Sequence, residues 1–353
     1  MSAQQISPAL PVVVLLALLL QGCAVSSRTP KADEPTLAAL YLPAAEDDGQ
    51  GLLHRFAPCF VVEDYQHDHN RIGAPTAEPS GKGGDEIHID TSRPAIFALA
   101  QNFTSGGKDF TNLIYRVHFP EVPWPHLTFG RNVGLLVYVT LNDRQQPVLV
   151  TTLHTCGCYL AMFPTSNLPR ASWPADWPLG NQEVYGEILP NQLPLDGKDT
   201  RGRLLVTLRG NTHRVKALTF TEVAALPGLT PIPARLLPMA TLDQLPVTEG
   251  SVSFFEQGGW RKGYVKGSSK PLERLFISWW ALDPLVGEDK SLGPSGKTGA
   301  TMYTSLKFWE RDASDIWEFP KFLSYWGWRL DVPPGDSRSE PPTARSVPPP
   351  AGP

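Results

Sequence analysis

Proline and glycine interrupt this chain so often that every regular element must be short. The 353 residues include 36 Pro and 30 Gly, distributed through the whole chain. Proline lacks a backbone N–H and fixes φ, so it ends helices and is excluded from the middle of central strands. Long helices and coiled coils are therefore excluded, and short strands joined by turns are favoured.

The composition is that of a folded globular protein with no nucleic-acid partner. Hydrophobic residues make up 41% and charged residues 19% of the chain, and the net charge is -4. No run of Lys or Arg occurs, so the chain offers no basic surface for phosphate groups. We expect no nucleic-acid binding.

The N-terminus carries an export signal. Leu10–Leu20 is an unbroken apolar run, too short to cross a bilayer and typical of a signal peptide. The n-region before it contains no Lys or Arg, unlike most export signals. The run ends in Leu20-Gln21-Gly22-Cys23, which resembles the bacterial lipobox. The resemblance implies that residues 1–22 are removed and that Cys23 carries diacylglycerol and palmitate.

The residue after Cys23 bears on localisation. Position two of the mature chain is Ala24 rather than Asp, and Asp there is the inner-membrane retention signal of enterobacterial lipoproteins. The resemblance therefore implies an outer-membrane protein of the cell envelope that faces the periplasm and is held to the membrane by its lipid.

The rest of the chain divides by composition into three parts. Residues 23–51 are small, polar and Pro-bearing, as expected of a lipidated flexible tether. Residues 52–331 form the expected globular periplasmic body. Residues 332–353 are Pro-rich and are expected to be disordered.

Strand patterns dominate the first part of the body. Leu135–Leu141 and Val148–Leu153 predict a hairpin, with Asn142-Asp143 at the turn and Pro147 at the entry to the second strand. Further alternating or β-branched runs predict strands at Phe60–Glu63, Ile87–Asp90, Ile96–Ala100, Leu113–Phe119, Glu183–Ile188, Arg203–Leu208 and Val215–Thr221.

The C-terminal part is different. Pro271–Leu285 and Gly299–Arg311 have apolar residues at spacings compatible with short helices, although strands are also compatible. We predict an α+β fold, predominantly antiparallel β and sandwich-like but distorted, with a shorter helical, aromatic-rich C-terminal part. The late Trp and Tyr residues, such as Trp279-Trp280, fit either buried packing or stacking on sugar rings.

The densest candidate site is His154-Thr155-Cys156-Gly157-Cys158, at the end of the second hairpin strand. Period-two geometry would place His154, Cys156 and Cys158 on one face. One imidazole and two thiolates suit zinc or copper. His67 and His69 also recur at spacing two and can complete such a site, although solvated histidines that hydrogen-bond neighbouring carboxylates are the more ordinary explanation.

Other uses of the cysteines stay open. An oxidising compartment favours a structural disulfide from Cys59 to Cys156 or Cys158. A direct bridge between Cys156 and Cys158 would close a small, reducible ring and indicate redox exchange. A third hypothesis makes one cysteine a nucleophile activated by a nearby histidine, as in a cysteine-dependent hydrolase.

The stretch from Gly134 to Thr165, with HTCGCY and MFPT, resembles a group of uncharacterised bacterial proteins that carry a His-x-Cys-Gly-Cys-Tyr element. In that group another histidine often follows the tyrosine, whereas this chain has Leu160. The resemblance implies no activity, but it favours a role for this element beyond a chance disulfide.

Three functions follow in order of expectation. The first is a lipid-anchored envelope protein that binds or scaffolds an envelope protein or glycan. The second is a metal-binding or thiol-redox protein that uses His154, Cys156 and Cys158, and the third is a cysteine-dependent hydrolase. The chain has no Gly-x-Ser-x-Gly elbow, phosphate-binding loop, dinucleotide fingerprint or His-Glu-x-x-His motif, so the sequence does not decide whether the protein is an enzyme. It also indicates no oligomeric state.

Overall fold

The structure is a computed structural model that describes residues 37–44, 51–81, 85–195, 202–222 and 229–330. These residues belong to one compact unit, 37–340. The expected signal peptide, the lipobox-like sequence and the Pro-rich tail lie outside the described residues.

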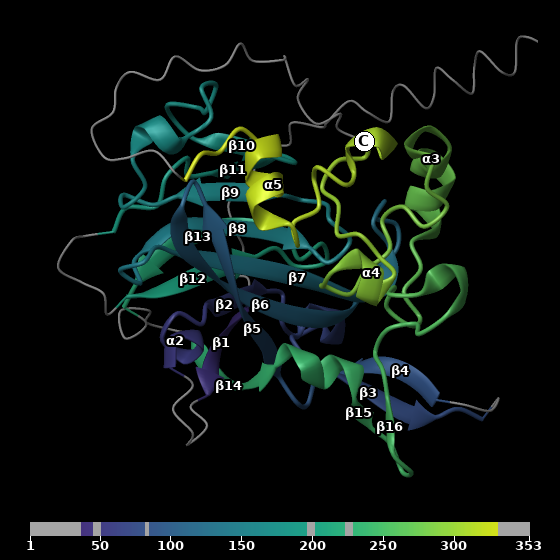
Figure 1. Ribbon diagram of the computed structural model, residues 1–353. Helices are drawn as coiled ribbons and strands as arrows, with labels where there is room; N and C mark the ends of the chain where they lie inside the picture. The colour runs from purple at the N-terminus through teal and green to yellow at the C-terminus, as the bar shows by residue number, and fades with distance from the viewer. Residues whose placement is uncertain (1–36, 45–50, 82–84, 196–201, 223–228, 331–353) are drawn as a thin grey trace, which may run out of the picture. The chain divides into compact units, whose positions relative to one another are not determined.

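A single 10-stranded sheet forms the framework of the molecule (Figure 1). Its strands, in spatial order, are β13 (Val215–Thr221), β12 (Arg203–Leu208), β2 (Cys59–Glu63), β1 (Ala38–Ala44), β14 (Thr230–Pro238), β5 (Ala95–Ser105), β6 (Lys108–Val122), β7 (Gly130–Leu141), β8 (Pro147–His154) and β9 (Ala161–Pro164). Three separate pairs complete the strands: β3 (Ala74–Pro79) with β4 (Asp85–Asp90), β10 (Gln182–Val184) with β11 (Glu187–Leu189), and β15 (Leu245–Pro246) with β16 (Ser251–Val252).

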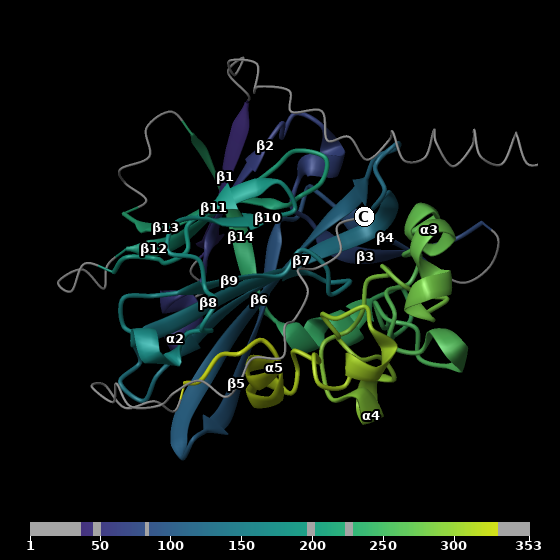
Figure 2. The same cartoon turned by 90° about the horizontal axis from the view of Figure 1, so that it is seen from above.

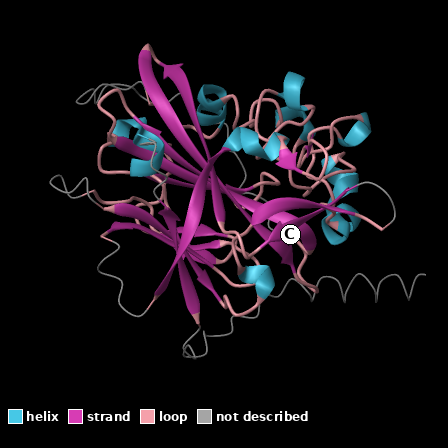
Figure 3. Ribbon diagram, turned by 90° about the horizontal axis from the view of Figure 1, so that it is seen from below, coloured by secondary structure: helices cyan, strands magenta, loops and turns pink. Residues whose placement is uncertain are grey.

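The expected β character is confirmed, but the sheet is mixed rather than mainly antiparallel. β5 to β9 form an antiparallel meander, whereas β1 pairs parallel with β14, β14 with β5, and β12 with β2. The large sheet curls (Figure 3) instead of forming two facing layers. Local hydrophobic patterns in the sequence indicate where strands form, but not which strands pair in the sheet.

The strand β1 comes from a segment that the sequence assigns to the tether. Ala38–Ala44 lies within the expected tether of residues 23–51, yet it sits between β2 and β14 in the sheet. Ala39, Leu40 and Tyr41 are buried. The folded body therefore begins before Leu52, because this short run of small and apolar residues gains its burial from strands far away in sequence.

Alternation along the meander divides its side chains between two cores. Leu113, Tyr115, Val117 and Phe119 alternate along β6, share one face and belong to the larger core. Ile114, Leu136 and Tyr138 point to the opposite face, where they pack with residues of the C-terminal part such as Phe319 and Phe322. The second core therefore attaches the C-terminal part to the outside of the sheet (Figure 2).

The predicted hairpin is confirmed as β7 and β8, with Pro147 as the first residue of β8. Asn142 Oδ1 accepts hydrogen bonds from the backbone N–H groups of Arg144 and Gln146. This side chain thus closes the loop locally, as turn-forming Asn residues do.

Two other predictions need correction. Glu183–Ile188 is not one strand: Tyr185 and Gly186 have positive φ and reverse the chain, giving the hairpin of β10 and β11. Pro271–Ala281 is helical as expected, but within Gly299–Arg311 the helical structure is one 3-10 turn, Phe308–Glu310. Tyr303 instead makes a bridge with Asp315.

The helices are short, as the prolines require. Among the described residues the α-helices are α2 (Gly51–Arg55), α3 (Pro271–Ala281), α4 (Ser295–Thr298) and α5 (Phe319–Tyr325). In the described part of the chain, none of them combines the length and apolar character needed to span a bilayer.

Candidate functional site

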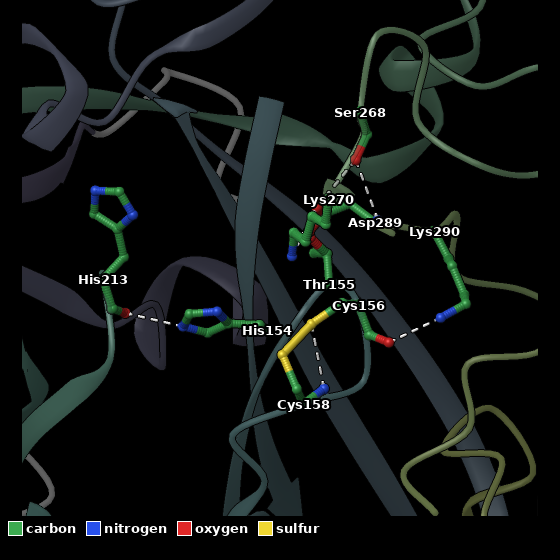
Figure 4. The surroundings of a disulfide bond; sticks show 9 residues. All are labelled: His154, Thr155, Cys156, Cys158, His213, Ser268, Lys270, Asp289 and Lys290. Carbon is green, nitrogen blue, oxygen red and sulfur yellow. Dashed lines mark hydrogen bonds and ion pairs between the residues drawn. A yellow bond between two sulfur atoms is a disulfide. The ribbon is translucent and has the colours of Figure 1, made fainter. Parts of the chain in front are cut away.

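The candidate site is a tight turn at the point where β8 leaves the sheet (Figure 4). The backbone N–H of Gly157 donates to His154 O at 2.8 Å, and the N–H of His154 donates to Cys158 O at 2.9 Å. Gly157 has φ +94°, and a Cβ there would lie 2.1 Å from Tyr303 O. Only glycine fits this position, because both the backbone conformation and the close approach exclude a side chain.

A disulfide joins Cys156 to Cys158 across this turn, and Cys59 is a free, buried thiol. The structure therefore does not contain the predicted bridge from Cys59. Cys59 lies on β2, and β1, β14, β5, β6 and β7 stand between β2 and β8 in the sheet. Burial raises the pKa of the Cys59 thiol to about 11, so it is not an activated nucleophile.

His154, Cys156 and Cys158 do come together, but not by strand alternation. β8 ends at His154, and the turn folds the two cysteines back beside it. One potential ligand atom from each residue lies within 4.8 Å of the others. The cluster could hold a metal ion, although the two sulfur atoms are bonded to each other here.

The ring of His154 is buried and electrically neutral. Its Nε2 lies 3.2 Å from the carbonyl oxygen of His213. A carbonyl oxygen only accepts, so Nε2 carries the proton and Nδ1 keeps its lone pair. Burial, together with the nearby cation of Lys270, lowers the pKa of His154 to about 3. The imidazole is thus a hydrogen-bond acceptor or metal ligand at neutral pH, not a cation.

His67 and His69 are not members of this cluster. Their rings stack on each other, and His69 Nε2 bonds Asn211 Oδ1 at 2.8 Å. His213 connects the two regions, because its Nε2 donates to His69 O at 2.9 Å and its own carbonyl accepts from His154. His69 thus supports the site through His213 instead of extending the ligand set.

His213 was not predicted from the sequence. It follows the turn between β12 and β13, and its ring stacks on Phe119 with centroids 3.9 Å apart. A single histidine after a Gly-Asn turn carries no motif. Its proximity to His154 arises only from the curl of the sheet.

A buried charged segment, Glu288–Lys290, lies under the turn and was also missed. Lys290 Nζ donates to Cys156 O at 2.8 Å, and the backbone N–H of Lys290 donates to Thr155 O at 2.9 Å. The Asp289 carboxylate accepts from Thr155 Oγ1 and Ser268 Oγ, and pairs with Lys270 Nζ at 3.2 Å. By composition alone, this charge-rich stretch resembles a solvated loop.

The two buried lysines differ in their pKa values. Burial lowers the pKa of Lys290 to about 8, and the carboxylates of Asp283 and Asp289 only partly oppose that shift. Burial also depresses the pKa of Lys270, but the adjacent Asp289 and Glu273 outweigh it, so that pKa is raised. Lys270 therefore stays charged across the physiological range, while Lys290 titrates near its upper end.

The two cysteines have different surroundings. Cys156 is 3% exposed, whereas Cys158 is partly exposed. The backbone N–H of Cys158 lies 3.4 Å from Cys156 Sγ, close enough to donate a weak hydrogen bond to sulfur. A hydrogen-bond donor of this kind favours a thiolate. Cys156 Sγ thus has a backbone donor, and Cys158 Sγ belongs to the more accessible residue.

Aromatic rings also border the site. The Tyr159 ring packs edge-on against His154 at 4.6 Å and against Tyr185 at 4.7 Å. The Arg214 guanidinium lies 5.8 Å from the centre of the Tyr159 ring. Tyr159 therefore covers His154, and the turn keeps Cys158 as its partly open position.

Comparison of the chain with known proteins identifies no relative. No family model, curated protein or solved structure matches the chain.

Proposed function

We propose that the protein performs thiol–disulfide exchange through Cys156 and Cys158. One observation carries the proposal: the disulfide joins residues two apart, of which Cys156 is buried with a backbone donor to its sulfur and Cys158 is partly exposed. A bond that closes so short a loop restricts the unfolded chain little and connects no distant segments. Stabilisation of the fold is thus a poor explanation for this disulfide.

The order of the exchange steps follows from the greater exposure of Cys158 relative to Cys156. A thiolate of an external dithiol attacks Cys158 Sγ, forms a mixed disulfide and releases Cys156 as a thiolate. The second external thiolate then attacks the external sulfur of the mixed disulfide and releases Cys158. Two external thiols lose two electrons and become a disulfide, and the cysteine pair gains the two electrons and two protons. The Nδ1 lone pair of His154 accepts a hydrogen bond from the reduced pair.

A redox titration tests this function. The chain is equilibrated in buffers of oxidised and reduced dithiothreitol, trapped with an alkylating reagent and analysed by peptide mass spectrometry. We expect Cys156 and Cys158 to be alkylated together along a reversible two-electron curve, while Cys59 gives no such curve. A pair that stays oxidised in every native buffer would contradict the proposal.

A metal site is the second candidate, favoured by the convergence of three ligand atoms. Reduction would free two thiolates that, with His154 Nδ1, suit zinc or copper(I). Native mass spectrometry of the reduced protein with either metal tests this function. A bound ion that is retained by His67→Ala and lost in His154→Ala would support it, and an ion-free reduced protein would exclude it.

We also propose the cellular setting: Cys23 is lipidated, and the body lies in the cell envelope, at the outer membrane and facing the periplasm. The support is the lipobox-like Leu20–Cys23 sequence behind a short apolar run. Metabolic labelling with palmitate tests it in the producing bacterium. Label in the parent chain and no label in Cys23→Ala are expected, and an unlabelled parent would contradict the anchor.

A further inference from the structure

Helix α3 exposes its apolar side. The helical spacing places four apolar side chains along one stripe, namely Leu275, Phe276, Trp279 and Trp280. Such stripes normally face a protein core, but these side chains are 67%, 49%, 73% and 43% exposed. In Figures 1 and 2, α3 lies at the outer edge of the C-terminal part. We call these four residues the α3 stripe.

Buried positions on the inward face of α3 set the orientation of the helix. Glu273 and Ala281 are the buried residues of this helix, and a Cβ on Gly287 would overlap the Glu273 carboxylate. The cations of Lys270 and Lys290 are near enough to affect the pKa of Glu273. With Glu273 and Ala281 turned inward, Leu275 and Trp279 lie on the far side of the helix, and Phe276 and Trp280 lie beside them. The orientation is therefore built into the packing of the protein.

We propose that the α3 stripe docks on a phospholipid membrane surface. Trp side chains with neighbouring aliphatic residues on one helix face are the composition that settles at the boundary of headgroups and acyl chains. All four carboxylates between Pro271 and Lys290 are buried, namely Glu273, Asp283, Glu288 and Asp289. No exposed acid in this segment would therefore repel lipid phosphates.

A groove beside the stripe supplies a cation for the headgroups. It has a volume of about 380 Å³ and is lined by Pro271, Arg274, Leu275, Ser278 and Pro284. The Arg274 side chain is 41% exposed and reaches Glu288 at 3.7 Å. Its guanidinium thus borders the stripe, where a headgroup phosphate would lie when the stripe is inserted.

The chain outside the described residues places a bilayer within reach, a step that rests on the proposed lipid anchor. Fully extended, the residues from Cys23 to Leu37 span on the order of 50 Å. A glycan is a poorer occupant, because sugar hydroxyls need free hydrogen-bond partners. The indole N–H of Trp279 already donates to Phe276 O at 3.0 Å.

Vesicle flotation of a lipid-free chain tests the proposal independently of lipidation. Residues 24–353 retain the whole sheet and both of its large cores, which lie within residues 37–330. This chain is mixed with vesicles of phosphatidylethanolamine and phosphatidylglycerol and centrifuged through a density gradient. We expect it to float, and we expect Leu275→Ser/Trp279→Ser to lower the partition coefficient about tenfold or more.

The matched control is Trp124→Ser, since Trp124 is 66% exposed between β6 and β7, outside α3. It should float like the parent, and circular dichroism should show that all variants are folded. A parent that does not float, or a double variant that floats equally well, would overturn the proposal. A concentration-dependent dimer, or binding to a glycan in place of vesicles, that the double variant abolishes would also overturn it.

Discussion

At the scale of single residues, the chemistry of the site depends on charges buried in unequal surroundings. His154 is neutral because burial and the Lys270 cation oppose its protonation. Lys290, fully buried, holds Cys156 O and has its pKa lowered to about 8. These two groups place a lone pair and a titratable cation on opposite sides of the disulfide, an arrangement that motif spacing alone does not reveal.

His154 should make the fold sensitive to acid. Its pKa is lowered from 6.5 to about 3, so between these values the unfolded chain binds a proton that the folded chain does not. Stability therefore falls as the pH drops below 6.5. Between pH 6.5 and about pH 4, denaturant unfolding should show the parent losing roughly 2–3 kcal/mol more than His154→Gln.

The substitution His154→Gln keeps an amide donor for His213 O but has no titrating group. The exposed His67 provides the control, since His67→Gln should follow the parent across the same pH range. If His154→Gln and the parent lose equal stability, His154 is not the group that senses acid.

At the scale of elements, the turn after β8 is built around one glycine. Gly157 combines a positive φ with a backbone neighbour, Tyr303 O, that leaves no room for a side chain. Gly186 also has a positive φ, +82°, in the hairpin of β10 and β11, but nothing lies within 4 Å of its Cβ position. A substitution at Gly186 therefore tests backbone strain alone, whereas one at Gly157 tests backbone strain together with steric overlap.

Gly157→Ala should destabilise the protein far more than Gly186→Ala. The Gly186 change adds only left-handed backbone strain, about 1 kcal/mol. The Gly157 change adds the overlap with Tyr303 O as well, for a total of about 3 kcal/mol or more. Chemical denaturation of both variants measures the difference. Equal losses would show that the turn and the Tyr303 segment are not in close contact.

The sequence predicts elements whose signals are local. The β7–β8 hairpin follows from two apolar runs around Asn142, and α3 from the apolar spacing after Pro271. β1 was missed because Ala38–Ala44 gains its strand conformation from partners far away in sequence. The same limit applies to the site: HTCGC is visible as a motif, whereas His213 and Lys290 reach it only through tertiary structure.

At the scale of the whole molecule, the parallel pairs at β1, β14 and β5 bring together segments that are far apart in the sequence. No cysteine bridge contributes to that long-range order, because the one disulfide among the described residues lies inside a single turn. Stability therefore rests on the two large cores and the ladder of strands.

Reduction should consequently cost the fold little. Opening a loop as short as that between Cys156 and Cys158 is worth about 1–2 kcal/mol by chain entropy. We expect the reduced parent and Cys156→Ser/Cys158→Ser to unfold at denaturant midpoints slightly below that of the oxidised parent. A loss of 4 kcal/mol or more, about the size seen for native disulfides that close long loops, would show that the bridge is structural.

The hydrogen bonds that shape the turn affect the expected rate of thiol–disulfide exchange. The contacts from Gly157 N to His154 O, from His154 N to Cys158 O and from Lys290 Nζ to Cys156 O involve no sulfur atom. They can persist when the S–S bond opens, so the oxidised and reduced proteins should differ by side-chain rotations rather than by a rearranged backbone. Little reorganisation would then separate the two states, and collision with the partner dithiol would limit the speed of turnover.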